Sequence, residues 1–380
     1  MEFVCDRKQC TGCGVCRDAC AIGCIEMRYD ENGFLQSYVD ESRCVNCGKC
    51  VSVCPVHHRQ NNHTVLESYK LQRKDREAVL SSTSGGAAAL LAEKTVSAGG
   101  VVCGCGFDEN LTLRHSVATD KNQLERFKGS KYVQSNTAGI YAAAKKHLKA
   151  GTEVLFIGTP CQVSGLKAFL GKDYENLTTV DLVCHGVASQ KILDRYLSQE
   201  KEPVLDVKFR TKHKGYLSCQ KNDLILVCKD GKKEIHHETG IVLWFASGLS
   251  LRESCYACPF SELQRCADIT LADYVGDDIT ADDRQYGVSM VLANTEKGIQ
   301  RIQALSEQAV IEKKPKQQSN YYARQPRKAP RLRKQFFKDL DRLPLQKMVE
   351  KYTLKKILPG KLTLYSKAAW NRVKRLIKLK

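Results

Sequence analysis

The chain has 380 residues, 42% hydrophobic and 27% charged, a composition typical of ordinary globular proteins and long enough for two or three domains. Its net charge is +18, but residues 311–380 hold 22 basic and 4 acidic residues and therefore contain the whole excess. The preceding body is neutral, which argues against a nucleic-acid-binding body and predicts a basic docking or surface-binding tail.

The first residues and the cysteines indicate the cellular compartment of the protein. Met1 to Cys5 lack the basic start and apolar core of a signal peptide, and the best apolar run, Ile241 to Leu251, has 11 residues, too few to span a bilayer. Nineteen cysteines, many in Cys-x-x-Cys runs and without a secretory signal, are typical of metal ligands rather than disulfides. We therefore expect a protein of the reducing cytoplasm.

Residues 1–62 contain the most specific motif. A C-x2-C-x2-C-x3-C run occurs twice, which is the bacterial ferredoxin signature of two [4Fe-4S] clusters. Three cysteines of each run serve one cluster and the fourth serves the other, so the predicted ligand sets are Cys10, Cys13, Cys16 and Cys54, and Cys44, Cys47, Cys50 and Cys20. Zinc is the alternative, but zinc knuckles favour paired Cys-x-x-Cys units. Cys5 and Cys24 lie outside the pattern and are expected to be small buried residues.

Residues 63–75 are polar and predict a linker, and residues 76–320 then alternate helical and strand-like patterns, which predicts a mixed α/β domain. The expected helices cover a segment after Gly86 to Ser97, Lys121–Lys128, Thr137–Ala150 and Val163–Leu170. The expected strands are Val101–Phe107, Thr112–Thr119, Glu153–Gly158 and Leu177–Val183, followed by a hairpin with Asp230-Gly231 at its tip.

Two loops of this domain suit an anionic cofactor. Ser84, Gly85 and Gly86 precede a helix, where free backbone N–H groups favour a phosphate, although such a run is also a common helix cap. The second loop places two cations and a hydroxyl around a glycine, as Lys128, Gly129, Ser130 and Lys131, and a solvated loop would look the same.

Four further cysteines lie where ligand sites form. Cys161 and Cys184 each follow a predicted strand, and sites in α/β sheets collect at the carboxyl ends of strands. Cys255 and Cys258 form a separate Cys-x-x-Cys. These four can hold a third [4Fe-4S] cluster, while a redox or zinc Cys-x-x-Cys with two unrelated buried thiols fits the spacing nearly as well.

Several motifs together resemble the coenzyme F420 hydrogenase/dehydrogenase beta-subunit family, including its members with a fused ferredoxin segment. The resemblance extends from Cys10 to about Gly298 and is carried by Lys128–Val133, Phe156–Leu166, Asp181–Gly186, Ser254–Cys258 and Asp268–Thr270. It implies an α+β protein in which a ferredoxin-like domain precedes a mixed α/β domain that binds FAD.

The same resemblance implies roles for individual residues. It makes Cys161, Cys184, Cys255 and Cys258 the ligands of the third cluster and places the loops 84–86 and 128–131 in the flavin pocket. This chain has Ala272–Gly276 where many relatives have Gly-Asp-Tyr/Phe-Trp-Gly, so the identity of the acceptor stays open between F420 and another organic molecule. Five cysteines match no ligand position and are expected to serve in packing: Cys103, Cys105, Cys219, Cys228 and Cys266.

Residues 321–380 form a basic extension in which Trp370–Lys380 predicts a short amphipathic helix. Such a segment can lie on an anionic membrane surface, here the inner face, or dock to an acidic partner, and a solvated terminus is the alternative. No nucleic acid is expected.

The resulting prediction is an iron-sulfur flavoprotein oxidoreductase that exchanges electrons with a redox partner protein or an organic acceptor. The alternatives are a non-catalytic electron-transfer subunit and a nucleic-acid-binding protein with structural clusters.

Overall fold

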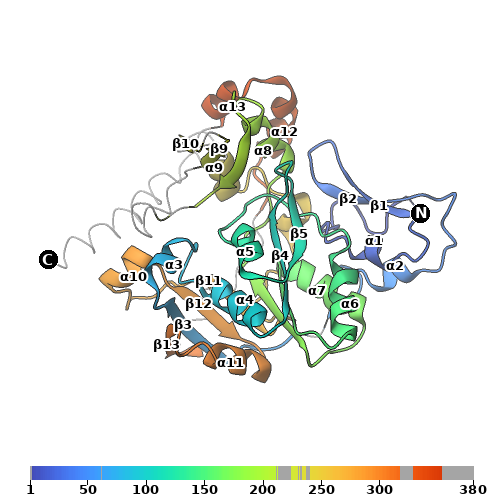
Figure 1. The fold of residues 1–380 in the computed structure, drawn as a ribbon. Helices are drawn as coiled ribbons and strands as arrows, with labels where there is room; N and C mark the ends of the chain where they lie inside the picture. The colour runs from blue at the N-terminus through green and yellow to red at the C-terminus, as the bar shows by residue number, and fades with distance from the viewer. Residues whose placement is uncertain are drawn as a thin grey trace.

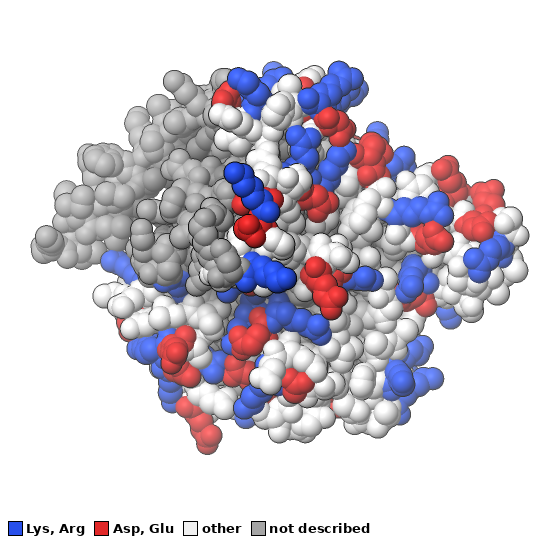
Figure 2. All heavy atoms as spheres, turned by 45° about the horizontal axis from the view of Figure 1, so that its top comes forward, with Lys and Arg blue, Asp and Glu red and all other residues white. Residues whose placement is uncertain are grey.

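The computed structural model describes residues 2–60, 62–210, 212, 224–229, 231, 233–236, 240–316 and 328–352. An amino-terminal ferredoxin-like domain lies against one side of a mixed α/β body, whose centre is a large mixed sheet (Figure 1). Lys and Arg side chains alternate with Asp and Glu over the face drawn in Figure 2, as expected for a body without net charge. Among the described residues, no helix is both long and apolar enough to cross a membrane.

The two halves of the ferredoxin-like domain share the same local structure. A short helix, α1 (Val15–Ala19) or α2 (Lys49–Ser52), starts after a glycine in the left-handed region, with φ of 75° at Gly14 and 72° at Gly48. Only glycine adopts this backbone without strain, and it lets the cysteine loop turn into the helix. The strands β1 (Ile25–Tyr29) and β2 (Leu35–Val39) form an antiparallel hairpin between the two halves.

The large sheet has eight strands in the order β13-β3-β12-β11-β7-β6-β4-β5. Its four central neighbours, β11, β7, β6 and β4, are parallel, while the outer strands pair antiparallel. The strand bounds are β3 (Glu67–Arg73), β4 (Val101–Phe107), β5 (Leu113–Ala118), β6 (Val154–Ile157), β7 (Leu177–Leu182), β11 (Ile269–Asp273), β12 (Ser289–Ala293) and β13 (Ala309–Lys314). The four strands expected between residues 101 and 183 are confirmed.

Helices cover both faces of this sheet. On one face, α6 (Ile140–Lys149) and α7 (Pro160–Leu170) share a core with Val15 and Val53 of the ferredoxin-like domain. On the other face lie α4 (Ala87–Ser97), α5 (Lys121–Leu124), the short η1 (Glu125–Phe127) and α11 (Glu296–Gln303). Two smaller helices, α3 (Arg76–Leu80) and α10 (Ala281–Tyr286), pack at the β3 end.

Residues 63–75, expected as a linker, instead contain β3, which lies between β13 and β12 in the sheet. Apolar and polar residues nevertheless alternate along this segment, and Tyr69 and Leu71 pack into the apolar core. Lys70 lies on the other face and is neutralised by Asp283, with 2.8 Å between Nζ and Oδ2. A buried lysine with a carboxylate partner can occupy an inner strand, so the polar composition was misleading.

The described residues of a second lobe form the three-stranded sheet β10-β9-β8 and four helices, two of which belong to the basic extension. The predicted hairpin is confirmed as β9 (Leu224–Cys228) and β10 (Lys233–His236), although Asp230 lies outside the described residues. The other elements are β8 (Val204–Lys208), α8 (Gln190–Leu197), α9 (Gly240–Ser247), α12 (Arg333–Arg342) and α13 (Leu345–Lys351).

The first part of the basic extension is therefore not a free tail. Phe336, Leu340 and Met348 of α12 and α13 are fully buried in the core of the second lobe, and the Trp244 indole donates a hydrogen bond to the Tyr352 carbonyl at 3.0 Å. The apolar residues recur on one side of these helices, and most of the cations are exposed, whereas Arg333 donates to the Leu251 carbonyl at 2.9 and 3.1 Å. The helix expected at Trp370–Lys380 lies outside the described residues.

Candidate functional site

The first predicted ligand set lies together inside the ferredoxin-like domain. Cys10, Cys13, Cys16 and Cys54 are all buried. Burial, with Cys10 and Cys54 close by, raises the pKa of the Cys16 thiol to about 12. A thiol with a raised pKa, such as that of Cys16, holds its proton unless a cation replaces it, which is the electrostatic condition for a metal ligand.

The second predicted set lies toward the outer end of the domain. Burial raises the pKa of Cys50, and the neighbouring Cys44 and Cys20 raise it further. Cys20, Cys44 and Cys50 are half-buried, whereas Cys47 is exposed. The two halves of the repeated motif therefore differ in their access to solvent.

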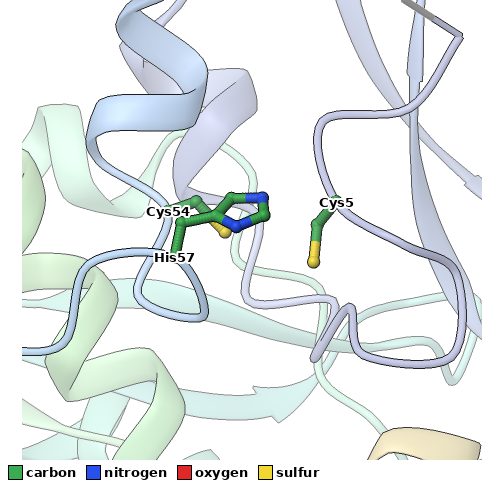
Figure 3. Close-up of side chains that lie close together, drawn as sticks. All are labelled: Cys5, Cys54 and His57. Atoms are coloured by element: carbon green, nitrogen blue, oxygen red, sulfur yellow. The ribbon is translucent and has the colours of Figure 1, made fainter.

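Cys5 and Cys24, which lie outside the motif, are both buried, as expected. Each contacts the fourth cysteine of a run, since the Cys24 and Cys20 sulfurs are 3.4 Å apart and Cys5 lies beside Cys54. A hydrogen bond from Cys5 is the main reason that the pKa of Cys54 falls to about 6. Cys5, Cys54 and His57 form a group whose ligand atoms all lie within 4.8 Å of one another (Figure 3).

The structure brings the other four cysteines together in one cavity. Its volume is about 70 Å³, room for more than one water molecule. Cys161 and Cys184 follow the adjacent parallel strands β6 and β7, and Cys255 lies in the short helix η3 (Glu253–Ala257), with Cys258 directly after it. Burial, with Cys161 and Cys255 nearby, raises the pKa of Cys258 to about 12. The cavity is lined by Thr11, Gln134, Thr159, Pro160, Cys161, Gln162, Cys184, His185, Gly186, Val187, Ser254, Cys255, Cys258, Phe260 and Ser261.

Cys161 lies in the first turn of α7, because this helix starts three residues earlier than the sequence pattern suggested. Thr159 caps the helix and Pro160 is its first residue, a position at which proline loses no hydrogen bond. The Gln162 side chain reaches back and accepts from the Thr159 N–H at 2.9 Å. The turn therefore fixes Cys161 at a helix N-terminus, where the helix dipole stabilises a thiolate.

Buried cations surround the cavity. Arg252 and Arg265 are only 2% and 4% exposed. Arg252 lowers the pKa of Cys161 and Cys255, while burial raises it. Arg265 acts in the same way on Cys258. Nη2 of Arg252 has no hydrogen-bond partner among the described residues, whereas the Arg265 guanidinium lies 3.7 Å from the buried Asp181 carboxylate and pairs with it. Buried donors of this kind suit a neighbouring anionic group.

The ferredoxin-like domain reaches directly into this site. Thr11 lines the cavity, and Cys161 is, after burial, the largest cause that raises the pKa of Cys13. A Cβ placed on Gly165, one turn after Cys161 on α7, would lie 3.6 Å from the Cys13 sulfur. Glycine at this position therefore allows the cysteine loop to approach the helix closely.

Hydrogen bonds fix this approach. The hydroxyls of Thr137 and Tyr141 donate to the Cys13 carbonyl at 2.6 and 2.7 Å. Arg252 donates from Nε to the Cys10 carbonyl at 2.7 Å and from Nη1 to Gln134 at 3.1 Å. The first cysteine set is thus held rigidly beside the cavity.

Comparison with known families explains this arrangement. Residues 151–319 match the model for the carboxyl-terminal part of the coenzyme F420 hydrogenase/dehydrogenase beta subunit, and residues 9–58 match that of a 4Fe-4S dicluster domain. The expected resemblance is confirmed, and the two matches identify an electron-transfer oxidoreductase with an iron-sulfur domain.

Among solved structures, the chain is similar to one chain of the F420-reducing [NiFe] hydrogenase complex from Methanosarcina barkeri. The TM-score is 0.45 with 17% sequence identity, covering 79% of this chain and 97% of that chain. The comparison with curated proteins found no match.

All four cavity cysteines fall within the beta-subunit region, but the loops expected to bind flavin precede it. Loops 81–86 and 128–131 do meet, because the Ser130 N–H donates to the Thr83 hydroxyl at 2.8 Å. None of the seven predicted residues lines the cysteine cavity. The structure therefore gathers these loops at a separate place.

Several of these side chains are engaged within the protein. The Ser84 hydroxyl donates to the Val288 carbonyl at 2.8 Å. The Lys131 ammonium donates to the carbonyls of Phe127, Lys128 and Gly129 at 3.0, 2.9 and 3.2 Å, and burial lowers its pKa. Lys128 pairs with Glu125 at 2.6 Å. Gly85 has no room for a side chain, since a Cβ would lie 2.2 Å from the Leu71 carbonyl oxygen. Ser84 and Lys131 thus support the loops.

Sequence reasoning missed other residues around the cavity. His185 could have been noticed, because it follows Cys184 directly. Arg252 also lies close in sequence, three residues before Cys255, whereas Thr11 and Gln134 come from distant segments and no spacing rule links them to Cys161. Of the five cysteines expected to serve in packing, Cys103, Cys228 and Cys266 are buried and Cys105 is half-buried, while Cys219 lies outside the described residues.

Proposed function

We propose that this protein is an iron-sulfur flavoprotein oxidoreductase with a third [4Fe-4S] cluster on Cys161, Cys184, Cys255 and Cys258. The observation that carries the proposal is the convergence of four thiols from three distant segments on one cavity. Four thiols, a cavity larger than a water site and the unpartnered Nη2 of the buried Arg252 suit an anionic cluster with four cysteine ligands. The residues of the cavity therefore fit a [4Fe-4S] cluster.

Each element of the chain has a part in this function. Cys10, Cys13, Cys16 and Cys54 would hold one ferredoxin cluster, and Cys44, Cys47, Cys50 and Cys20 the other. Electrons would pass between the ferredoxin-like domain and the cavity at the contact of Cys13 with α7. Arg252 and Arg265 favour the added negative charge of a reduced centre, and their burial keeps water from screening it.

FAD is proposed from the family resemblance. When bound, flavin converts one-electron into two-electron chemistry, so that a hydride can be exchanged with F420 or another organic acceptor. In this chain the loops 84–86 and 128–131 would contribute mainly backbone groups, with Ser84 and Lys131 positioning them.

A second candidate is a non-catalytic electron-transfer subunit that docks to a partner enzyme. It is favoured by the internal bonding of Ser84, Lys128 and Lys131, which occupies the polar groups expected to bind flavin. Flavin that co-purifies and is bleached by a reduced substrate would support the enzyme. Cluster signals without flavin would support the carrier.

The decisive experiment is anaerobic purification followed by measurement of iron, sulfide and flavin. Three clusters predict about 12 irons per chain, and about eight would remove the third cluster from the proposal. Cys161→Ser should lower the iron toward eight while leaving the ferredoxin signals in place. The control is Cys103→Ala, which changes a buried thiol of β4 and should leave the iron unchanged. Unchanged iron in Cys161→Ser would show that Cys161 is not a ligand.

A further inference from the structure

The two cysteine sets of the ferredoxin-like domain differ in what covers them. The first set is buried against α6 and α7, whereas the second faces outward. Among the described cysteines, only Cys47 is exposed. Electrons that pass to or from a buried cavity must enter or leave the protein at a centre that a partner can reach. The cysteine set that contains Cys47 is exposed enough for this.

Apolar side chains lie beside this exposed cysteine. Val45 is 64% exposed and Ile22 is 46% exposed. The two segments adjoin each other, because the Arg43 guanidinium donates to the Ile22 carbonyl at 3.0 Å. A Cβ on Gly48 would meet no other atom within 4 Å, so the loop projects into open space. Large exposed apolar residues beside a redox centre are typical of a protein contact.

The charged side chains within the loop that carries Cys47 are cations. The exposed Arg43 and Lys49 flank Cys47, and residues 42–66 contain no Asp or Glu. The exposed acids nearest in sequence, Asp40 and Glu41, precede the loop, and the Asp40 carboxylate accepts hydrogen bonds from the N–H and hydroxyl of Ser42 at 3.1 and 2.6 Å. A cationic rim steers an acidic partner and disfavours a basic one.

We propose that Ile22, Arg43, Val45, Cys47 and Lys49 form a docking surface, the Cys47 face, for an acidic one-electron carrier protein. In each encounter the carrier loses one electron and is oxidised, and the chain gains it through the cysteine set at this face. The reverse transfer uses the same contact. A small apolar centre with a charged rim suits the brief, small contacts of electron-transfer partners. This inference rests on the proposed function, because it assumes clusters in the ferredoxin-like domain.

The test measures electron transfer by stopped-flow absorbance from a reduced acidic bacterial 2[4Fe-4S] ferredoxin, used as the probe, to the full chain. The variants are Arg43→Glu with Lys49→Glu, and separately Val45→Glu. The matched control is Lys94→Glu with Lys121→Glu, which reverses two exposed cations on α4 and α5 on the opposite face of the sheet. Reduced methyl viologen serves as a small reductant that does not need a protein contact.

The double reversal at the Cys47 face should slow transfer from the ferredoxin about tenfold or more, because an attractive rim becomes repulsive. It should not slow reduction by methyl viologen, and the control variant should match the wild type. The wild-type rate should also fall as salt rises, and the double reversal should remove this dependence. Val45→Glu should slow only the ferredoxin reaction.

Two results would overturn the docking surface. One is a ferredoxin rate within about twofold of the wild type in both variants, and the other is an equal loss in the control variant. Iron is counted in each variant, so that a lost cluster is not mistaken for lost docking. A wild-type chain without ferredoxin-type clusters would instead refute the proposed function, and the two failures are therefore distinguishable.

Discussion

The molecule has two kinds of cysteine site, and they are built in opposite ways. In the ferredoxin-like domain, the ligand sets come from two compact runs of about ten residues each, and short helices after left-handed glycines shape them. The cavity instead takes Cys161, Cys184 and the pair Cys255 and Cys258 from segments separated by more than 20 residues. The first site depends on local backbone geometry, whereas the second depends on the order of strands in the sheet.

This difference has a thermodynamic consequence. A site made by local loops can form with its metal, since few distant contacts are needed. A site made by strand ends exists only once β6 and β7 are paired and η3 has docked beside them. We therefore expect the cavity to be more sensitive than the ferredoxin-like domain to changes in the packing of the body.

Arg252 should produce the largest effect, because it joins the two sites. Arg252→Met removes the donor to the Cys10 carbonyl and one of two donors to the Gln134 side-chain oxygen, which keeps the Leu35 N–H at 3.0 Å. We expect a loss of about 3–5 kcal/mol in the free energy of unfolding, because each hydrogen bond from a charged donor contributes about 1.5–3 kcal/mol, and chemical denaturation would measure this loss. Removing the cation should also lower the reduction potential of the adjacent centre, which a redox titration would measure.

The control for Arg252 is Arg126→Met, which removes an exposed guanidinium of η1 and should change neither the free energy of unfolding nor the reduction potential appreciably. An unchanged potential in a folded Arg252→Met protein would mean that this cation does not act on the centre. Arg252→Lys should recover part of the potential shift but not the stability, because an ammonium cannot reproduce both hydrogen bonds.

His115 should produce the next largest effect, and only in acid. Burial lowers the pKa of this histidine to about 4. Its ring stacks on Phe156 with centroids 5.8 Å apart, and its Nε2 lies 3.2 Å from the Ile157 carbonyl oxygen, just before the Cys161 turn. The unfolded chain binds a proton near pH 6.5 and the folded chain does not. The contribution of His115 to the free energy of unfolding is therefore fully present above pH 6.5. It falls by about 3 kcal/mol as the pH drops toward 4.

Denaturation midpoints of the wild type and His115→Gln between pH 7 and 4 would measure this loss. The variant should be less stable at pH 7 but should lose about 3 kcal/mol less on acidification. His58→Gln, at an exposed histidine of the ferredoxin-like domain, is the control and should follow the wild type. If His115→Gln lost as much stability on acidification as the wild type, His115 would not be the cause of the loss in acid.

The two sites also differ in how far the sequence predicts them. The spacing of the repeated motif is enough for the ferredoxin-like domain, since ligands from one loop need only local geometry. For the cavity, strand ends indicate Cys161 and Cys184, but spacing alone leaves Cys255 and Cys258 undecided, and the family resemblance was needed to join them. Thr11 could not be predicted, because it reaches the cavity only through the packing of the two domains, and no spacing rule links Gln134 to the cysteines.

Misjudged segments have a common physical cause. The strand β3 can include the buried Lys70 because Asp283 neutralises it, and α12 can be highly charged because its apolar residues lie on one side and enter the core. In both cases the pattern along the chain carried the information, while the average composition concealed it.

Gly165 tests how closely the two sites must approach. A Cβ at this position would lie 3.3 Å from the Tyr141 hydroxyl and 3.4 Å from Val15. Gly165→Val should force the ferredoxin-like domain away from α7 and cost about 1–3 kcal/mol in the free energy of unfolding. It should also slow electron transfer between the two sites, measured by freeze-quench spectroscopy. Ala142→Val, at an exposed position of α6, is the control. If Gly165→Val left the rate of electron transfer between the two sites unchanged, electrons would not depend on the close contact between Cys13 and α7.

Asp18 should give the smallest effect, because it acts only at the edge of the contact between the domains. Its carboxylate, fully buried in α1, accepts from the N–H groups of Gly139 and Tyr141 at 2.8 and 3.2 Å, so the ferredoxin-like domain caps α6 of the body. Asp18→Ala should cost about 1 kcal/mol in the free energy of unfolding, and Asp18→Asn should cost less, since an amide oxygen also caps a helix. Hydrogen exchange should rise first at the start of α6. A rise spread evenly over the body would mean that the contact between the domains does not depend on this cap.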